Sequence, residues 1–210
     1  MTAAPKLRLI VASHNPDKAA VVRAVVGAAA EVMPAPRGIS LETGESHDSL
    51  GANAEEKARY VSRQVPGTLV VATDGGLEIP ALGTDWNPVL TRRFAGPDAT
   101  NADRMRALLA RTRQLAGADR AIAWREAMAI ARDGETIACW EETGPAGLLA
   151  ESAPAHVDGQ DGFWLPLLWQ CPEFDGRLLS DLSERERGTR YDHWQRLGER
   201  LRTFLAGVGS

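Results

Sequence analysis

The sequence predicts an α/β fold, and two stretches with alternating strands and helices carry that prediction. Residues 7–12 (LRLIVA) form a short apolar run rich in branched side chains, which is typical of a buried strand. A polar turn and a helix-forming stretch over 18–30 follow it. A second helix is predicted over 52–63, and a second buried strand (TLVVA) over 68–72. Strands that alternate with helices in this way are typical of α/β domains.

Sequence patterns in the remainder of the chain predict further helices, strands and loops. Apolar residues make up 44% of the sequence and charged residues 25%, and 210 residues are enough for one domain with a sizeable core. In chain order, the patterns predict a connector over 33–40, an amphipathic helix over 98–115, a strand pair over 121–131 and 136–140, a loop over 144–162 and a closing helix over 192–205.

Charge and cysteine content limit the classes of function. The formal net charge of −4 argues against nucleic-acid binding, because such binding depends on cationic side chains that neutralise phosphates. Cys139 and Cys171 lack the spacing of metal ligands, so two free thiols in a reducing cytoplasm are expected. Residues 1–9 lack the apolar core of a signal peptide, and no apolar run approaches the roughly 18 residues of a membrane-spanning helix. We therefore expect a cytoplasmic protein with neither nucleic-acid nor membrane partners.

The first group of residues that carries chemistry lies between the first strand and the first helix. Ser13 and Asn15 belong to the polar turn, and Lys18 begins the predicted helix. A helix N-terminus offers unpaired N–H groups and a partial positive charge, which suit a phosphate. The pattern of a P-loop is absent, and an ordinary capped helix start explains the same residues. Phosphate binding and simple capping both stay open at this point.

A second group combines an acidic loop with the second predicted helix. Glu42 lies in a loop, where its carboxylate can reach Mg²⁺, an ion that usually takes one or two protein carboxylates together with phosphate oxygens. Asn53 and Lys57 are one turn apart, so both project from the same face of the helix. A solvated helix face is the simpler explanation of that pair.

A third group follows the second strand. Residues 73–76 (TDGG) predict a turn at the carboxyl end of that strand, which is the edge where open α/β sheets bind ligands. Glycines allow a ligand to approach the backbone closely, and Asp74 can bind a metal or act as a general base toward water. An aspartate before a glycine is also common in ordinary turns.

Aromatic side chains in the last third of the chain form a fourth group. Phe163 and Trp164 begin an apolar segment, and His193 and Trp194 begin the closing helix. Aromatic faces stack on nucleobases, which contributes about 1–3 kcal/mol per base. A core cluster with a structural histidine explains the same residues, and composition alone favours it.

The order and spacing of these groups resemble the inosine triphosphate pyrophosphatase family, which removes deaminated purine nucleotides. Residues 10–23 (IVASHNPDKAAVVR) resemble the family's opening T/S-x-N-x-x-K segment. Residues 42–58 (ETGESHDSLGANAEEKA) resemble its E-T-G…E-N-A-x-x-K-A block with a short insertion, and residues 72–83 (ATDGGLEIPALG) its A-D-D-S-G-L…A-L-G block. Residues 93–96 (RFAG) are similar to R-Y-A-G, and the segment around His193 is similar to S-H-R-G.

The resemblance implies a long curved mixed sheet flanked by helices. It would form a single two-lobed domain over 1–210 with a central nucleotide cleft, usually in a homodimer. The implied enzyme is a Mg²⁺-dependent nucleoside triphosphate diphosphatase, with Mn²⁺ as an alternative ion. By position, its catalytic residues would be Asp74, Lys57 and Glu42, with Glu42 and Asp74 as the metal ligands. The implied substrate-binding residues are Ser13, Asn15, Lys18, Asn53, Gly75, Phe163, Trp164, Arg187, His193 and Trp194.

Departures from the family pattern concentrate on the side that would read the base. Thr73 replaces the first aspartate of A-D-D-S-G and Gly75 replaces its serine, so one acidic group near the metal is lost. The F-G-Y-D-P segment has no aspartate here, the arginine of S-H-R is Trp194, and Arg187 stands in for a lysine. Sites built from hydrogen bonds discriminate strongly between substrates. These changes therefore predict relaxed or altered base specificity, with a modified nucleotide as one candidate substrate.

Two other functions stay open. A catalytically impaired nucleotide-binding protein would explain Thr73 and the changed base side, and it would bind nucleotides without turnover. A nucleotide phosphatase in a specialised biosynthetic pathway would release orthophosphate, instead of pyrophosphate, as its first product.

Overall fold

The computed structural model describes two compact units of the chain. The first unit comprises residues 1–75, 126–143 and 192–210, and the second comprises 76–125 and 144–191. Within them, the described residues are 7–13, 16–41, 48–154, 163–190 and 192–208. Among these residues, no helix is both long enough and apolar enough to cross a membrane.

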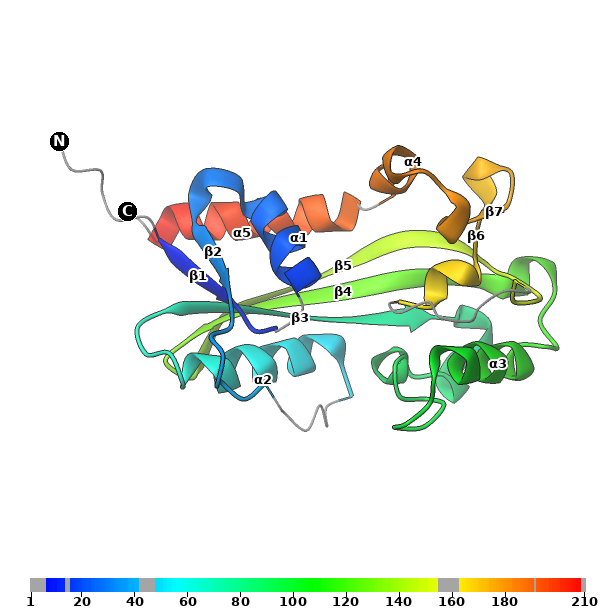
Figure 1. Cartoon of the computed structure of the whole chain (residues 1–210), viewed down its shortest axis with the longest axis horizontal. Helices are drawn as coiled ribbons and strands as arrows, with labels where there is room; N and C mark the ends of the chain where they lie inside the picture. Colours follow the sequence, from blue (N-terminus) through cyan, green and yellow to red (C-terminus); the bar gives the residue numbers. More distant parts are fainter. Residues whose placement is uncertain (1–6, 14–15, 42–47, 155–162, 191, 209–210) are drawn as a thin grey trace. The chain divides into compact units, whose positions relative to one another are not determined.

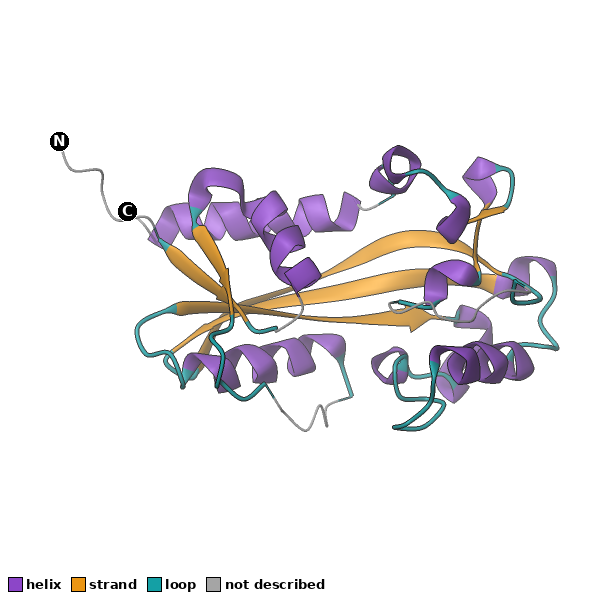
Figure 2. Cartoon of the chain, viewed as in Figure 1, coloured by secondary structure: helices purple, strands orange, loops and turns teal. Residues whose placement is uncertain are grey.

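The strands form one mixed sheet (Figure 1; Figure 2). They are β1 (Arg8–Val11), β2 (Glu31–Pro34), β3 (Leu69–Glu78), β4 (Ala121–Arg132), β5 (Glu135–Leu149), β6 (Trp169–Cys171) and β7 (Arg177–Leu178). Their order in the seven-stranded sheet is β2-β1-β3-β4-β5-β6-β7. β1 is parallel to β2 and β3, whereas β6 is antiparallel to β5 and β7. A mixed sheet with flanking helices confirms the predicted α/β class.

Helices connect and cover the strands. The α-helices are α1 (Pro16–Val26), α2 (Leu50–Ser62), α3 (Asn101–Arg111), α4 (Glu184–Gly188) and α5 (Asp192–Val208). Short 3-10 helices are η1 (Gly27–Ala29), η2 (Pro80–Asp85), η3 (Pro88–Leu90), η4 (Gly117–Arg120), η5 (Leu165–Leu167), η6 (Pro172–Phe174) and η7 (Leu179–Asp181).

In the first unit, helices cover both faces of the sheet (Figure 1). Val11 of β1 and Val71 of β3 belong to a core cluster that includes buried residues of α1 and α5. Ile10, the neighbour of Val11, belongs instead to a cluster with Val61 of α2. Because successive strand residues point to opposite faces, α1 and α5 cover one face and α2 covers the other.

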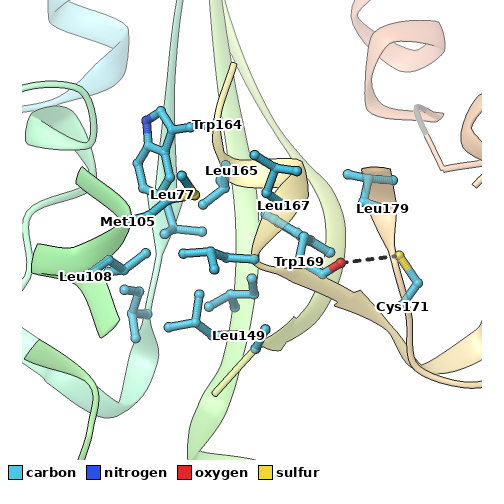
Figure 3. Packing of buried hydrophobic residues seen from close by; sticks show 14 of the residues in the cluster. Leu77, Met105, Leu108, Leu149, Trp164, Leu165, Leu167, Trp169, Cys171 and Leu179 are labelled. Carbon is cyan, nitrogen blue, oxygen red and sulfur yellow. Dashed lines mark hydrogen bonds between the residues drawn. The ribbon is translucent and has the colours of Figure 1, made fainter. Parts of the chain in front are cut away.

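The second unit has its own hydrophobic core, part of which Figure 3 shows. Leu77 of β3, Leu108 of α3 and Trp169 of β6 are all at most 2% exposed. The Sγ of Cys171 lies 4.0 Å from the main-chain oxygen of Trp169 (Figure 3). Burial raises the pKa of the Cys171 thiol, so this cysteine is a neutral core residue.

The predicted turn over 73–76 is wrong, because β3 continues through these residues to Glu78. Neither Gly75 nor Gly76 has a positive φ. A Cβ atom on Gly76 would lie 2.3 Å from the main-chain oxygen of Pro88, so glycine is required there by close packing. Gly76 therefore marks close approach within a strand, and the chain does not reverse direction.

Other boundaries also differ from the prediction. β2 ends at Pro34, inside the predicted connector, and this proline is tolerated because β2 is an edge strand. β5 extends to Leu149, inside the predicted loop, because Leu148 and Leu149 pair with β6. α3 begins later than predicted because Thr100 and Asp103 form a capping box at its start, and it ends at Arg111.

Candidate active site

The centre of the candidate site is the part of β3 that continues past the end of β1. The two strands pair as far as Val11 and Val71, and the N–H of Ala12 donates to the oxygen of Val71 at 2.8 Å. Thr73 and Asp74 lie two and three residues beyond Val71, the last residue of β3 that pairs with β1. Thr73 shares the face of Val71, toward α1 and α5, and Asp74 points to the opposite face, toward α2.

Asp74 is held by two side chains of α2. The Nζ of Lys57 donates to Oδ1 of Asp74 at 2.8 Å, and the Nδ2 of Asn53 donates to Oδ2 at 3.3 Å. The side chains of Lys57 and Asp74 are each 15% exposed, so this ion pair lies mostly out of water. The helical spacing of Asn53 and Lys57 thus brings both residues to one carboxylate, as expected for side chains one turn apart.

The beginning of α2 is fixed by two further polar contacts. The Oγ of Ser49 accepts a hydrogen bond from the N–H of Ala52 at 3.2 Å and caps the helix. Oε1 of Glu141 in β5 accepts one from the N–H of Gly51 at 3.1 Å. These contacts hold the helix that presents Asn53 and Lys57 to Asp74.

On the other face of β3, Thr73 is the partner of Lys18. The Nζ of Lys18, in the first turn of α1, donates to Oγ1 of Thr73 at 3.3 Å. Thr73 is 7% exposed, whereas Lys18 is half-buried. Ser13 lies two residues after the end of β1 and is also half-buried, and Asn15 lies outside the described residues.

The predicted metal site depends on Asp74 and Glu42. Glu42 lies outside the described residues, so the pairing of these two carboxylates stays a prediction. The described part of the chain holds no group of three or more His, Cys, Asp or Glu side chains that could hold a metal ion. Asp74 nevertheless fits Mg²⁺ as one ligand, because each carboxylate oxygen keeps a further lone pair and Mg²⁺ takes its other ligands from water and phosphate.

His193 and Trp194 begin α5 in the first unit. His193 is 1% exposed, and burial lowers the pKa of its imidazole to about 4, so the ring is neutral near pH 7. The rings of His193 and Trp194 have centroids 5.8 Å apart. Trp194 also packs against the core shared by α1 and α5.

An ion-pair network joins α5 to β5 one turn after His193. The Nε atoms of Arg196 and Arg200 donate to the two carboxylate oxygens of Glu142, each at 2.8 Å. The hydrogen bond from Arg196 is the largest cause that holds the pKa of Glu142 below its ordinary value. This network fixes the helix end that carries His193.

The remaining predicted site residues belong to the second unit. Phe163 is 56% exposed, and its ring lies 5.3 Å from the ring of Trp124 in an edge-to-face arrangement. Trp164 lies in the hydrophobic core (Figure 3) and is 4% exposed, and its ring centroid is 6.3 Å from that of Phe94. This burial favours the core interpretation of Trp164 over a base contact. Arg187 is half-buried in α4.

Three contributors were not identified from the sequence. The sequence pattern indicates only that Thr73 replaces an aspartate, whereas in the structure its hydroxyl accepts a hydrogen bond from Lys18. Trp124 carries no motif, and only the fold places it beside Phe163. The contact between Glu142 and Arg196 joins residues far apart in the chain, and no local signal in the sequence indicates it.

Comparison with known proteins supports one family. The Ham1 family model matches residues 9–199. A dITP/XTP pyrophosphatase of Acidobacterium capsulatum is 34% identical over 209 residues, which cover 95% of this chain and 97% of that protein. Another, from Caldanaerobacter subterraneus, is 30% identical over 183 residues, covering 86% of this chain and 88% of that protein.

Solved structures show the same fold. A HAM1 protein from Coxiella burnetii has a TM-score of 0.79 at 24% identity, covering 96% of this chain and 99% of that one. A dITP/XTP pyrophosphatase from Mycobacterium abscessus has a TM-score of 0.68 at 28% identity, covering 95% and 99% of the two chains.

Proposed function

This chain belongs to the Ham1 family, as its motifs predicted, and we propose that it hydrolyses a nucleoside triphosphate to the monophosphate and pyrophosphate. It is a nucleoside triphosphate diphosphatase, the class of its dITP/XTP pyrophosphatase relatives. In this reaction, water attacks the α-phosphorus, and the bond from that phosphorus to the oxygen bridging to the β-phosphate breaks.

The observation that carries the proposal is the cluster of Asp74, Lys57 and Asn53. The two α2 side chains fix the orientation of the Asp74 carboxylate and leave a lone pair on each oxygen. Asp74 can therefore orient the attacking water and accept its proton. Lys57 and Lys18 supply positive charge, which stabilises the negative charge on the transferred phosphoryl group.

The proposed cofactor is Mg²⁺, with Mn²⁺ as an alternative. Asp74 and Glu42 are the residues that would hold it. When bound, the ion supplies charge neutralisation on the phosphate oxygens. The remaining work falls to residues of the chain: Asp74 orients the water, and Ser13, Asn15 and Lys18 are proposed to bind the phosphates.

We further propose that base specificity is altered from inosine and xanthosine nucleotides, with a modified nucleotide as one candidate substrate. Phe163 is exposed enough to stack on a base, whereas Trp164 belongs to the core. Trp194 replaces a cation of the family pattern and packs against apolar side chains. A pocket with fewer hydrogen-bonding side chains selects less strongly between bases.

The larger assembly is also a proposal. We propose one two-lobed domain over residues 1–210, and a cytoplasmic homodimer that binds neither nucleic acid nor membrane. Light scattering after size exclusion tests the homodimer, because a monomeric mass at micromolar concentration would contradict it.

Asp74→Asn tests the catalytic proposal, because asparagine keeps the size of aspartate without its charge. With Mg²⁺ and a panel of nucleoside triphosphates, pyrophosphate release should fall by about 10³-fold. Asp98→Asn, at an exposed position, is the matched control and should retain full activity. Removing the metal with EDTA should abolish release by the wild-type protein. Tight nucleotide binding without turnover by the wild type would instead favour the impaired binding protein, and orthophosphate as first product would favour the phosphatase.

The specificity proposal needs its own comparison. kcat/KM values for dITP, dATP and dCTP that lie within about tenfold of one another would support relaxed specificity, because a tenfold ratio is a small difference in binding energy. A strict preference for dITP and XTP would refute it.

A further inference from the structure

Two lysines reach β3 at neighbouring residues, and their partners differ in charge. Lys57 donates to the carboxylate of Asp74 at 2.8 Å. Lys18 donates to the neutral hydroxyl of Thr73 at 3.3 Å. The charge of Lys57 is therefore compensated within the first unit, whereas Lys18 has no carboxylate partner in the described part of the chain.

The surroundings of Lys18 add positive electrostatic potential and fix the position of its ammonium group. Lys18 lies in the first turn of α1, where the helix dipole adds further positive potential. Thr73 is buried in the sheet, and its β-branched side chain has few rotamers, so its hydroxyl is a fixed acceptor. This contact orients the ammonium group and leaves its net charge unchanged.

We propose that Thr73 is a positioning residue for Lys18 and gives this site an affinity for polyphosphate that needs no divalent metal. The inference rests on the proposed function, because it assigns Lys18 to the phosphates of that substrate. A carboxylate in place of Thr73 would form an ion pair with Lys18, and a phosphate would then have to compete with it. The neutral hydroxyl imposes no such competition.

Calorimetric titration with inorganic tripolyphosphate in EDTA at low ionic strength tests the inference. We expect the wild type to bind the anion, and Lys18→Met and Thr73→Asp to bind it at least about tenfold more weakly, because the first removes the ammonium charge and the second pairs it with a carboxylate. Thr73→Asn matches aspartate in size but is neutral, so it should lose at most about threefold. Thr84→Asp, at an exposed position of the second unit, is the control for an added negative charge and should bind like the wild type.

A double variant tests whether Thr73 acts through Lys18. If it does, Thr73→Asp should cause little further loss in a Lys18→Met background, because the interacting partner is already gone. A purely structural effect of Thr73 would lower affinity equally in both backgrounds, and that result would overturn the inference.

The remaining outcomes are also decisive. Equal losses in Thr73→Asn and Thr73→Asp would refute the role of charge. Undiminished metal-free binding by Lys18→Met would refute the inference even if Thr73→Asp fails to fold. If the wild type does not bind tripolyphosphate in EDTA but releases pyrophosphate from a nucleotide with Mg²⁺, the inference fails and the proposed function stands. If the anion binds as expected and no nucleotide is hydrolysed, the proposed function fails instead.

Discussion

The first unit and the second unit hold their predicted site residues in different ways. In the first, Asp74 has defined polar partners in Lys57 and Asn53. In the second, Trp164 is buried in an apolar core, whereas the neighbouring Phe163 is 56% exposed. The site proposed for the phosphates therefore consists of polar side chains with defined partners, whereas the side proposed for the base is mainly apolar.

The largest effect is expected from removing the ion pair between Lys57 and Asp74 in the first unit. Lys57→Met keeps the length of the side chain but removes its charge, and it leaves the partly buried carboxylate of Asp74 without its ion-pair partner. We expect kcat to fall by about 10²-fold. Lys57→Arg, which keeps the charge, should recover part of the loss. Steady-state kinetics with Mg²⁺ measures both, and an unchanged kcat in Lys57→Met would remove Lys57 from catalysis.

Substitutions of Trp164 and Phe163 test whether these neighbouring aromatic residues have different roles in the second unit. Trp164→Leu opens a cavity in the core and should lower the free energy of unfolding by about 3 kcal/mol. Phe163→Leu should change that free energy by less than about 1 kcal/mol, because the ring is exposed, but it should raise KM by about tenfold through lost stacking. Urea denaturation and kinetics measure the two effects. The reverse pattern would assign base contact to Trp164.

The buried imidazole predicts a pH dependence of stability. Burial lowers the pKa of His193 from 6.5 to about 4, so the unfolded chain binds a proton more readily than the folded one. The stability linked to His193 is therefore complete above pH 6.5 and is lost as the pH falls toward about 4. The free energy of unfolding should fall by up to about 3 kcal/mol over this range, and His193→Gln should remove this pH dependence. If the free energies of unfolding of wild type and variant changed equally with pH across this range, the prediction would be contradicted.

A smaller and more acidic effect is expected from Glu142. Arg196 and Arg200 lower the pKa of this carboxyl below its ordinary value of 4.5, so its contribution is present above that pH and is lost at lower pH. Glu142→Gln should cost about 1 kcal/mol near pH 7, since both arginines are partly exposed. Below the folded pKa of Glu142, thermal denaturation should show equal stability for Glu142→Gln and the wild type. A cost that persists in strong acid would indicate lost packing, not lost charge.

Local sequence patterns predicted much of the first unit. The strand that became β1, the helices α1 and α2, and the shared face of Asn53 and Lys57 all depend on residues close in the chain. Composition also predicted α5, whose apolar residues recur at helical spacing. These predictions succeeded because each element is specified by its own periodicity.

The rest required contacts between distant residues. Gly75 and Gly76 suggested a turn, and only Pro88 explains why Gly76 lies inside a strand. The hydrogen bond between Lys18 and Thr73 joins residues on two different elements. The sequence around Trp164 fits a core residue and a ligand contact equally well, and only its burial distinguishes them. The role of Glu42 stays a prediction, because it lies outside the described residues.

Hydrolysis in water labelled with heavy oxygen tests the central claim most directly, because the label marks the phosphorus that water attacks. With Mg²⁺ and a nucleoside triphosphate that the enzyme turns over, mass spectrometry should find the label in the nucleoside monophosphate and unlabelled pyrophosphate. Label in pyrophosphate, or labelled orthophosphate as the first product, would contradict attack at the α-phosphorus and with it the assigned reaction.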